Sequence, residues 1–312
     1  MVKELQEGLS DKDINKIIGI LEKKGKSKWL KRWQSHMALP NNINILNKNI
    51  DEVEKILRYL LLRVLINQQA RFEKVREMSI RISEEFTDAL LLRPYEISES
   101  KIFKIFKDVA GDKGSLLYRV GALGGIKPIS LFTYRFKTYE GFIRWLNENN
   151  LYFFNIIKEK LNEKSYNLFD FLCTHTILNA GWVGNDPKAC RMFVNWIVFL
   201  FNEVWELEIG DIKDTLMIVD GHVGKVFCRS GLLNQVIYEK SRPYIIQASK
   251  MRKSIEDIVY NSKRIPFYVD NGAFYLFEDE YCLDINPNCD SCPINKHCKK
   301  YIKWTAYKIF EK

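Results

Sequence analysis

The sequence lacks an apolar run long enough to cross a membrane. The best candidate stretch, Ile197 to Phe201, is interrupted by Asn202 and Glu203, whereas a membrane helix needs about 20 apolar residues. The first residues, MVKELQEGLSDKDINKI, carry charges where a secretory signal would have its apolar segment. We therefore expect no membrane partner and a location inside the cell, cytoplasmic and nucleoid-associated in a prokaryote or nuclear in a eukaryote.

Proline and glycine are also scarce, with 8 and 16 among 312 residues, and the sequence has no internal repeat or low-complexity linker. This composition excludes collagen-like and low-complexity chains. Hydrophobic residues make up 46% of the chain, which is enough to bury a real core. The length predicts one large domain or two small ones.

Strand patterns are few. Residues 266–277, PFYVDNGAFYLF, hold Asp270, Asn271 and Gly272 between two aromatic runs, and this pattern predicts a small hairpin. Elsewhere apolar residues recur at spacings of three and four, which is the helical period. We expect an all-α protein with compact lobes, in which the clearest helical stretches are 51–66, 72–86, 139–147 and 188–208.

The chain is basic, with 48 Lys and Arg against 39 Asp and Glu, a net charge of +9 and a pI near 9.0. Such a balance is compatible with a nucleic-acid partner. A lysine-rich surface in contact with solvent explains it equally well. The same two interpretations apply to the run KKGKSKWLKRW at 23–33, which is either a phosphate-contacting arm or a solvated helix.

Four of the seven cysteines lie near the C-terminus, at Cys282, Cys289, Cys292 and Cys298, with the spacing C-x6-C-x2-C-x5-C. Thiolates this close in sequence can converge on one metal centre. Disulfides are disfavoured in a chain expected inside the cell. Zinc is the stronger rival, although its four-cysteine sites usually have two C-x2-C pairs and this chain has one. The other three cysteines lie on apolar stretches and read as buried small hydrophobic residues.

The spacing of the cysteine loop, 282–298, resembles the [4Fe-4S] loop of the endonuclease III and MutY branch of the helix-hairpin-helix DNA glycosylases. The resemblance implies that the four cysteines are cluster ligands, with zinc as the alternative. It also places Lys296, Lys299 and Lys300 where they could contact DNA phosphates; a solvated basic tail explains each of these lysines equally well.

The stretch ILNAGWVGNDPKACR resembles the hairpin of the same family. Gly181 and Gly184 would allow the tight turn whose amides hold a phosphate, although an ordinary helical hairpin could carry the same glycines. Asp186 and Pro187 fit the N-cap and first position of the next helix, which puts Lys188 in its first turn. A partly desolvated lysine at a helix N-terminus favours the neutral amine, which is a nucleophile.

The stretch VDGHVGK resembles the catalytic-aspartate motif V-D-x-H-V-x-R of the family, and Lys225 stands where the family has arginine. The resemblance makes Asp220 the catalytic carboxylate and puts His222 beside the DNA. Asp220 also fits a plain N-cap, and one residue can serve both roles.

A polar segment near the front of the resemblance, INQQARF, supplies the expected contacts with the extruded base. Asn67, Gln68 and Gln69 carry amides that can pair with base edges or fill the gap in the duplex; a polar turn between helices is the alternative. Trp182 in the hairpin could stack on a base, although core packing fits it better.

The resemblance implies a two-lobed helix-hairpin-helix fold, with a six-helix barrel domain and an iron-sulfur domain. We assign 55–185 to the barrel, which ends in the hairpin, and 1–54 with 186–312 to the cluster domain, with DNA in the cleft between them. The protein is expected to be a monomer that binds double-stranded DNA with a damaged base.

The implied activity is a base-excision DNA glycosylase with AP-lyase activity, in which Lys188 attacks C1′ and Asp220 stabilises the developing positive charge. The D-x-K hairpin sequence and the long segment from Lys188 to Asp220 resemble the archaeal 8-oxoguanine DNA glycosylase branch, so 8-oxoguanine is the favoured base.

Three alternatives remain open at this point. The first is a monofunctional glycosylase for deaminated or mismatched bases, and the second is a cluster-bearing DNA-binding protein without catalysis. The third is a zinc-stabilised helical module for RNA or protein.

Overall fold

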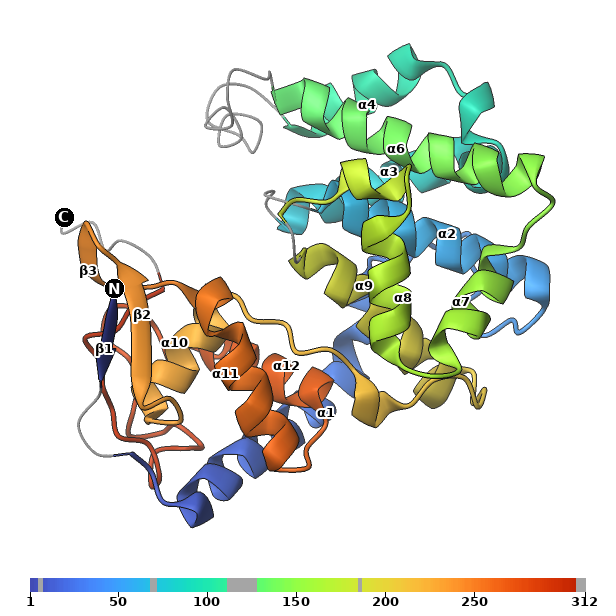
Figure 1. The fold of residues 1–312 in the computed structure, drawn as a ribbon. Helices are drawn as coiled ribbons and strands as arrows, with labels where there is room; N and C mark the ends of the chain where they lie inside the picture. Colours follow the sequence, from blue (N-terminus) through green and yellow to red (C-terminus); the bar gives the residue numbers. More distant parts are fainter. Residues whose placement is uncertain (5–7, 68–71, 111–127, 185–186, 307–312) are drawn as a thin grey trace. The chain divides into compact units, whose positions relative to one another are not determined.

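The computed structural model describes residues 1–4, 8–67, 72–110, 128–184 and 187–306. They are mostly helical, as expected, and they also form a small three-stranded sheet that the sequence patterns do not predict (Figure 1). No helix within these ranges is long and apolar enough to cross a membrane.

The chain divides into two compact units. Both ends of the chain contribute to unit 1, Met1–Trp33 and Ile212–Lys312, and unit 2 is Gln34–Asp211. The bounds assigned from sequence, 54/55 and 185/186, both lie inside unit 2. The physical reason is that α2 (Ile50–Ile66) and α9 (Lys188–Phe199) pack against each other and belong to one core.

Unit 2 is built around helix α2. Asn49 caps this helix by accepting a hydrogen bond from the Asp51 N–H at 2.9 Å, and from Val53 onward every residue of α2 except Lys55 is buried. Its neighbours in the unit are α3 (Phe72–Leu92), α6 (Pro128–Glu148), α7 (Phe153–Leu161) and α9. The other elements are η1 (Pro94–Glu96), α4 (Glu99–Ala110), α8 (Ser165–Thr174), η3 (Leu178–Gly181) and η4 (Leu200–Val204).

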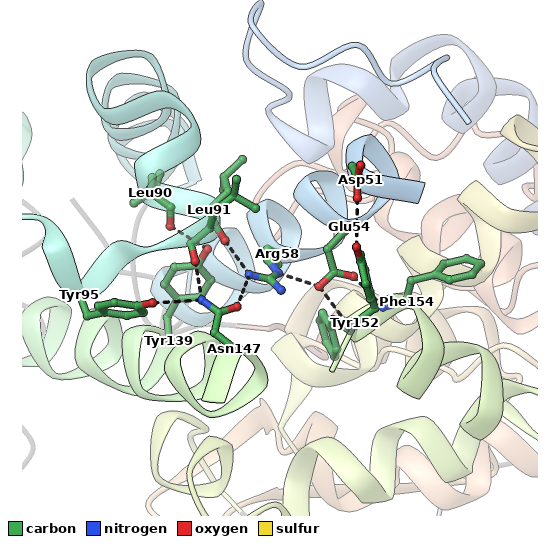
Figure 2. Close-up of polar contacts among 12 residues, drawn as sticks. Asp51, Glu54, Arg58, Leu90, Leu91, Tyr95, Tyr139, Asn147, Tyr152 and Phe154 are labelled. Carbon is green, nitrogen blue, oxygen red and sulfur yellow. Dashed lines mark hydrogen bonds and ion pairs between the residues drawn. The ribbon is translucent and has the colours of Figure 1, made fainter. Parts of the chain in front are cut away.

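A buried polar network ties α2 to the elements around it (Figure 2). The Glu54 carboxylate accepts hydrogen bonds from the backbone N–H groups of Phe153 and Phe154 at 2.9 and 2.8 Å, so it caps the start of α7. It also accepts one from the Arg58 guanidinium at 2.7 Å. Arg58 in turn donates to the Leu91 carbonyl at 3.2 Å. The two buried charges therefore compensate each other, and the network acts as a structural anchor.

Unit 1 contains most of the first helix, α1 (Asp11–Met37), and the elements that follow η5 (Ile212–Asp214). These are α10 (Gly221–Ser230), α11 (Ala248–Asn261) and α12 (Pro266–Glu278), together with the strands β1 (Val2–Glu4), β2 (Gln235–Glu239) and β3 (Arg242–Ile246). One hydrophobic core joins α1, α10, α11, α12 and the sheet.

The sheet has the order β1-β2-β3 and both pairs are antiparallel. Val2 pairs with Ile237, so the start of the chain forms an edge strand beside a segment far away in sequence. On the other edge Ile245 forms a parallel bridge with Thr305. Strands of three to five residues carry too little alternation to be predicted, and pairing between distant segments leaves no local pattern.

The prediction of a hairpin at 266–277 is wrong, because this stretch is helix α12. Pro266 occupies the first turn, where a missing N–H costs nothing. The three turn-forming residues all fit the helix interior: Asp270 is buried and accepts a hydrogen bond from the Ile218 N–H at 2.8 Å. The Asn271 amide donates to the Phe267 carbonyl one turn back, at 2.6 Å.

Gly272, the third of these residues, lies where α12 meets α1. A Cβ atom at this position would stand 1.9 Å from the Leu21 carbonyl oxygen, and one at Gly25 of α1 would stand 1.8 Å from the Tyr268 carbonyl oxygen. The two helices therefore touch backbone to backbone at a pair of glycines. This contact explains why a glycine stands at position 272 inside the buried helix α12.

The basic face of α1 is paired with the end of α12. Lys24 forms an ion pair with Asp279 at 2.5 Å, Lys28 contacts the same carboxylate, and Arg32 contacts Glu278. Burial raises the pKa of the Asp279 carboxyl, but hydrogen bonds from the two lysines outweigh this and hold the pKa below its ordinary value. Three cations of the basic run thus serve packing within unit 1.

We expect Gly272→Ala to destabilise unit 1 severely, because α1 and α12 would have to separate to admit a methyl group. Overpacking of this kind costs about 3 kcal/mol or more. The measurement is the thermal unfolding midpoint, with Ala273→Gly on the same helix as a control for a change of one methyl group. A midpoint for Gly272→Ala equal to that of the wild type would contradict the observed crossing.

Candidate metal centre and motif residues

All four cysteines of the cysteine loop line one cavity in unit 1. The wall is completed by the end of α10, at Arg229 and Ser230, and by Tyr281 and Ile294. The described residues after α12 form no helix or strand apart from the isolated bridge at Thr305. Short backbone hydrogen bonds shape the loop instead, such as Cys292 N–H to the Cys289 carbonyl at 3.2 Å and Cys298 N–H to the Ile294 carbonyl at 3.0 Å.

The surroundings of the thiols disfavour negative charge. Burial raises the pKa of Cys282 and Cys292, and it raises the pKa of Cys298 to about 11. The neighbouring thiols add to this effect, because each would repel a second thiolate. Burial and mutual repulsion thus oppose the ionisation of these thiols, and a bound metal centre would offset both effects.

The donor set fits an iron-sulfur cluster or zinc, since four soft sulfur ligands suit both. Among the described residues, however, no three His, Cys, Asp or Glu side chains are arranged so that they could hold a metal ion as they lie.

Helix α10 carries two buried cations, Arg229 in the wall of the cavity and Lys225 one turn earlier. The Arg229 guanidinium lies 3.8 Å from the Cys282 sulfur and donates to the carbonyls of Leu283 and Asp284 at 2.5 and 3.2 Å. Lys225 is fully buried, and its Nζ atom lies 3.3 Å from the Asp284 carboxylate. Burial lowers the pKa of Lys225, while the charges of Asp284 and Cys282 oppose this effect.

Asp220 is the N-cap of α10, as its sequence position allows. Its Oδ1 atom accepts hydrogen bonds from the N–H groups of His222 and Val223, both at 3.0 Å. The side chain is partly exposed, and the positive end of the helix dipole favours a carboxylate there. The His222 ring stacks on Phe277, with ring centroids 3.5 Å apart.

The predicted hairpin glycines in unit 2 have different tasks. Gly184 has a φ of +81°, a conformation that other residues rarely adopt. Gly181 is buried, and a Cβ atom there would lie 2.8 Å from Thr138 and 2.9 Å from Leu65. Trp182 is 9% exposed, and its indole N–H donates to the Leu172 carbonyl at 2.8 Å. This tryptophan therefore packs in unit 2.

Lys188 is the first residue of α9, and Pro187 is its N-cap. This is one position later than the assignment from sequence, which used Asp186 as the N-cap; residue 186 lies outside the described residues. The Lys188 side chain is exposed, so the partial desolvation that would favour its neutral amine would have to come from a bound substrate.

The expected base-contacting segment is described only at its start. Asn67 is the C-cap of α2 and is partly exposed, and its N–H donates to the Val64 carbonyl at 3.2 Å. Gln68 and Gln69 lie outside the described residues. Of the three remaining cysteines, Cys190 and Cys228 are buried as expected, whereas Cys173 is partly exposed.

Sequence reasoning missed the residues that surround Cys282. Lys225, Arg229 and Asp284 are ordinary charged residues in sequence. The fold buries Lys225 and Arg229, and it brings the Asp284 carboxylate within 3.3 Å of the Lys225 Nζ atom. One signal was available: Lys225 and Arg229 lie four residues apart, and therefore on one face of a helix that begins at Asp220.

Comparison of the chain with known protein families, with curated proteins and with solved structures found no match. The resemblance to the helix-hairpin-helix glycosylases therefore rests on the quoted motifs.

Proposed function

We propose that the protein is a base-excision DNA glycosylase that carries a four-cysteine metal centre, with a [4Fe-4S] cluster favoured over zinc. Its partner would be duplex DNA with a damaged base, 8-oxoguanine being the favoured lesion. An AP-lyase step through Lys188 is part of the proposal.

The arrangement of α10 carries this proposal. Asp220 caps the first turn of this ten-residue helix, and Arg229 and Ser230 in its last turn line the four-cysteine cavity. The resemblance assigns the aspartate motif and the cysteine loop to one family. Asp220 lies at the start of helix α10, and the cysteine loop lies against the last turn of the same helix. Such an arrangement would hold a carboxylate on a scaffold that the metal centre stabilises.

The proposed role of Asp220 is electrostatic. Its carboxylate is held in place by two backbone amides, so it needs little reorganisation when positive charge develops on the sugar. The proposed role of Lys188 is nucleophilic: its neutral amine would form a bond to C1′ as the bond to the base breaks, and the departing base would take up a proton. The amine would then lose a proton and the C1′–O4′ bond would break, so that O4′ becomes a hydroxyl and a Schiff base is left between Lys188 and C1′. Proton abstraction from the sugar would then allow cleavage on the 3′ side.

The proposed role of the metal centre is structural. Ligation by four thiolates leaves no open position for substrate. Because Lys188 is exposed, its amine is not desolvated by the protein alone. A second candidate function is therefore a monofunctional glycosylase in which this lysine only contacts DNA.

The test is base release from duplexes that each carry one modified base: 8-oxoguanine, an oxidised pyrimidine, a deaminated base or a mismatch. We expect release from one of these duplexes and none from undamaged DNA. Tight binding without release would favour the DNA-binding protein that lacks catalysis. A colourless protein that contains zinc, does not bind damaged DNA and releases no base would favour the zinc-stabilised module.

A further inference from the structure

The cysteine loop depends on other elements for its shape. In the described residues it has no regular secondary structure between Cys282 and Cys298. Ile294 is its one buried residue, since the four cysteines are partly exposed. A loop with so small an apolar content cannot fix four side chains by its own packing. Contacts with other elements must therefore set the positions of the thiols, and these include the hydrogen bonds from Arg229 and contacts at the two ends of the loop.

The second end of the loop is tied to the start of α1. The His297 Nδ1 atom, next to Cys298, lies 2.8 Å from the Asp13 Oδ1 atom. The other oxygen of Asp13 accepts a hydrogen bond from the Ser10 hydroxyl at 2.7 Å, and the Asp13 N–H donates to that hydroxyl at 3.2 Å. The Asp13 side chain is thus held by Ser10, the residue before α1, as well as by its contact with His297 in the loop.

The first end of the loop is tied to the same helix three turns later. Lys24 pairs with Asp279 at 2.5 Å, and its Nζ atom lies 5.1 Å from the ring centroid of Tyr281, the residue before Cys282. The Lys24 side chain is 15% exposed, so this cation is partly removed from water and its contacts are stronger than those of a surface pair.

We propose that Asp13 and Lys24 are positioning residues for the metal centre, and that α1 acts as a clasp that holds both ends of the cysteine loop. This inference rests on the proposed metal centre and applies to a cluster or to zinc alike. It gives the N-terminal segment, which carries no motif of its own, a defined task. Neither residue contacts the metal or DNA in this scheme.

If α1 holds both ends of the cysteine loop, loss of either contact should increase the rate at which metal is released. The protein, isolated with its metal and without oxygen, is mixed with an excess of a coloured iron or zinc chelator. We expect Asp13→Ala and Lys24→Met each to release metal about five-fold faster than the wild type, because each loses one charge-assisted contact. The double variant should release it about 25-fold faster, since the two contacts hold different ends and their effects multiply.

Matched controls separate the clasp from a general change of charge or stability. Asp11→Ala removes an exposed carboxylate from the same helical turn, and Lys23→Met removes the exposed lysine next to Lys24; both should release metal at the wild-type rate. Asp13→Glu keeps the carboxylate and should restore slow release and the wild-type visible spectrum. A merely structural role for Asp13 would lower the unfolding temperature without changing the rate of release.

Two results would overturn the clasp. One is release from Asp13→Ala and Lys24→Met at the wild-type rate. The other is a wild-type protein that binds neither iron nor zinc. Base release is measured separately, so a protein that holds metal firmly through α1 but releases no base would support the clasp and reject the glycosylase.

Discussion

Lys188→Gln should abolish the covalent adduct that borohydride traps between the protein and damaged DNA. Glutamine has no amine, so it cannot form the imine that borohydride reduces. The fold should be unaffected, because Lys188 is exposed at the first position of α9. DNA affinity should fall by no more than about ten-fold, the effect of losing one phosphate-directed charge. The measurement is trapping and duplex affinity on the same preparation.

Two further variants sharpen this experiment. Lys188→Arg keeps the positive charge but is not a nucleophile, so it should bind DNA like the wild type and form no adduct. Lys164→Gln removes an exposed lysine at the start of α8 in the same unit and should trap normally. Normal trapping by Lys188→Gln would assign the nucleophile to another amine and leave Lys188 as a surface residue.

Asp220→Asn should lower the rate of base release by a factor of about 100 to 1,000, the usual cost of removing a group that stabilises transition-state charge. It should leave the thermal midpoint nearly unchanged, because asparagine is as good an N-cap as aspartate and can accept the same two hydrogen bonds. Asp220→Ala should lose both functions and about 1 kcal/mol of stability. Single-turnover base release and thermal unfolding give the two readouts.

The pair of variants separates the two roles of this residue. If Asp220→Asn releases base at the wild-type rate while Asp220→Ala is less stable, Asp220 is a helix cap and the proposed chemistry is wrong.

The parts of the fold that could be predicted are those with a local signal. The apolar period of 51–66 predicts α2 to within one residue, and its polar start at Asn49 explains where the helix begins. The cap at Asp220 could be predicted because an acidic residue directly precedes a helical pattern. These signals depend on neighbours in sequence, and in these two helices the distant contacts agree with them.

The parts that could not be predicted depend on distant contacts. The local sequence at 270–272 is typical of a turn, yet it is helical in the fold. Only a glycine at position 272 lets α1 approach this closely, and Asp270 accepts a hydrogen bond from the Ile218 N–H. Strand β1 forms because Val2 pairs with Ile237 of β2, a residue far away in sequence. Tertiary contacts override local preference in both cases.

The candidate site divides in the same way. The spacing of the cysteines predicts that they share one site, and all four do line one cavity. The buried cation of Lys225 and the tie between Asp13 and His297 could not be predicted, because they depend on which charged residues the fold removes from water.

Borohydride trapping of the purified wild-type protein on a panel of duplexes, each with one lesion, tests the central claim most directly. The account predicts a covalent adduct on one lesion, with 8-oxoguanine favoured, and none on undamaged DNA. Free base without an adduct would keep the glycosylase and remove the lyase step. An absence of both adduct and released base on every duplex would contradict the proposed activity.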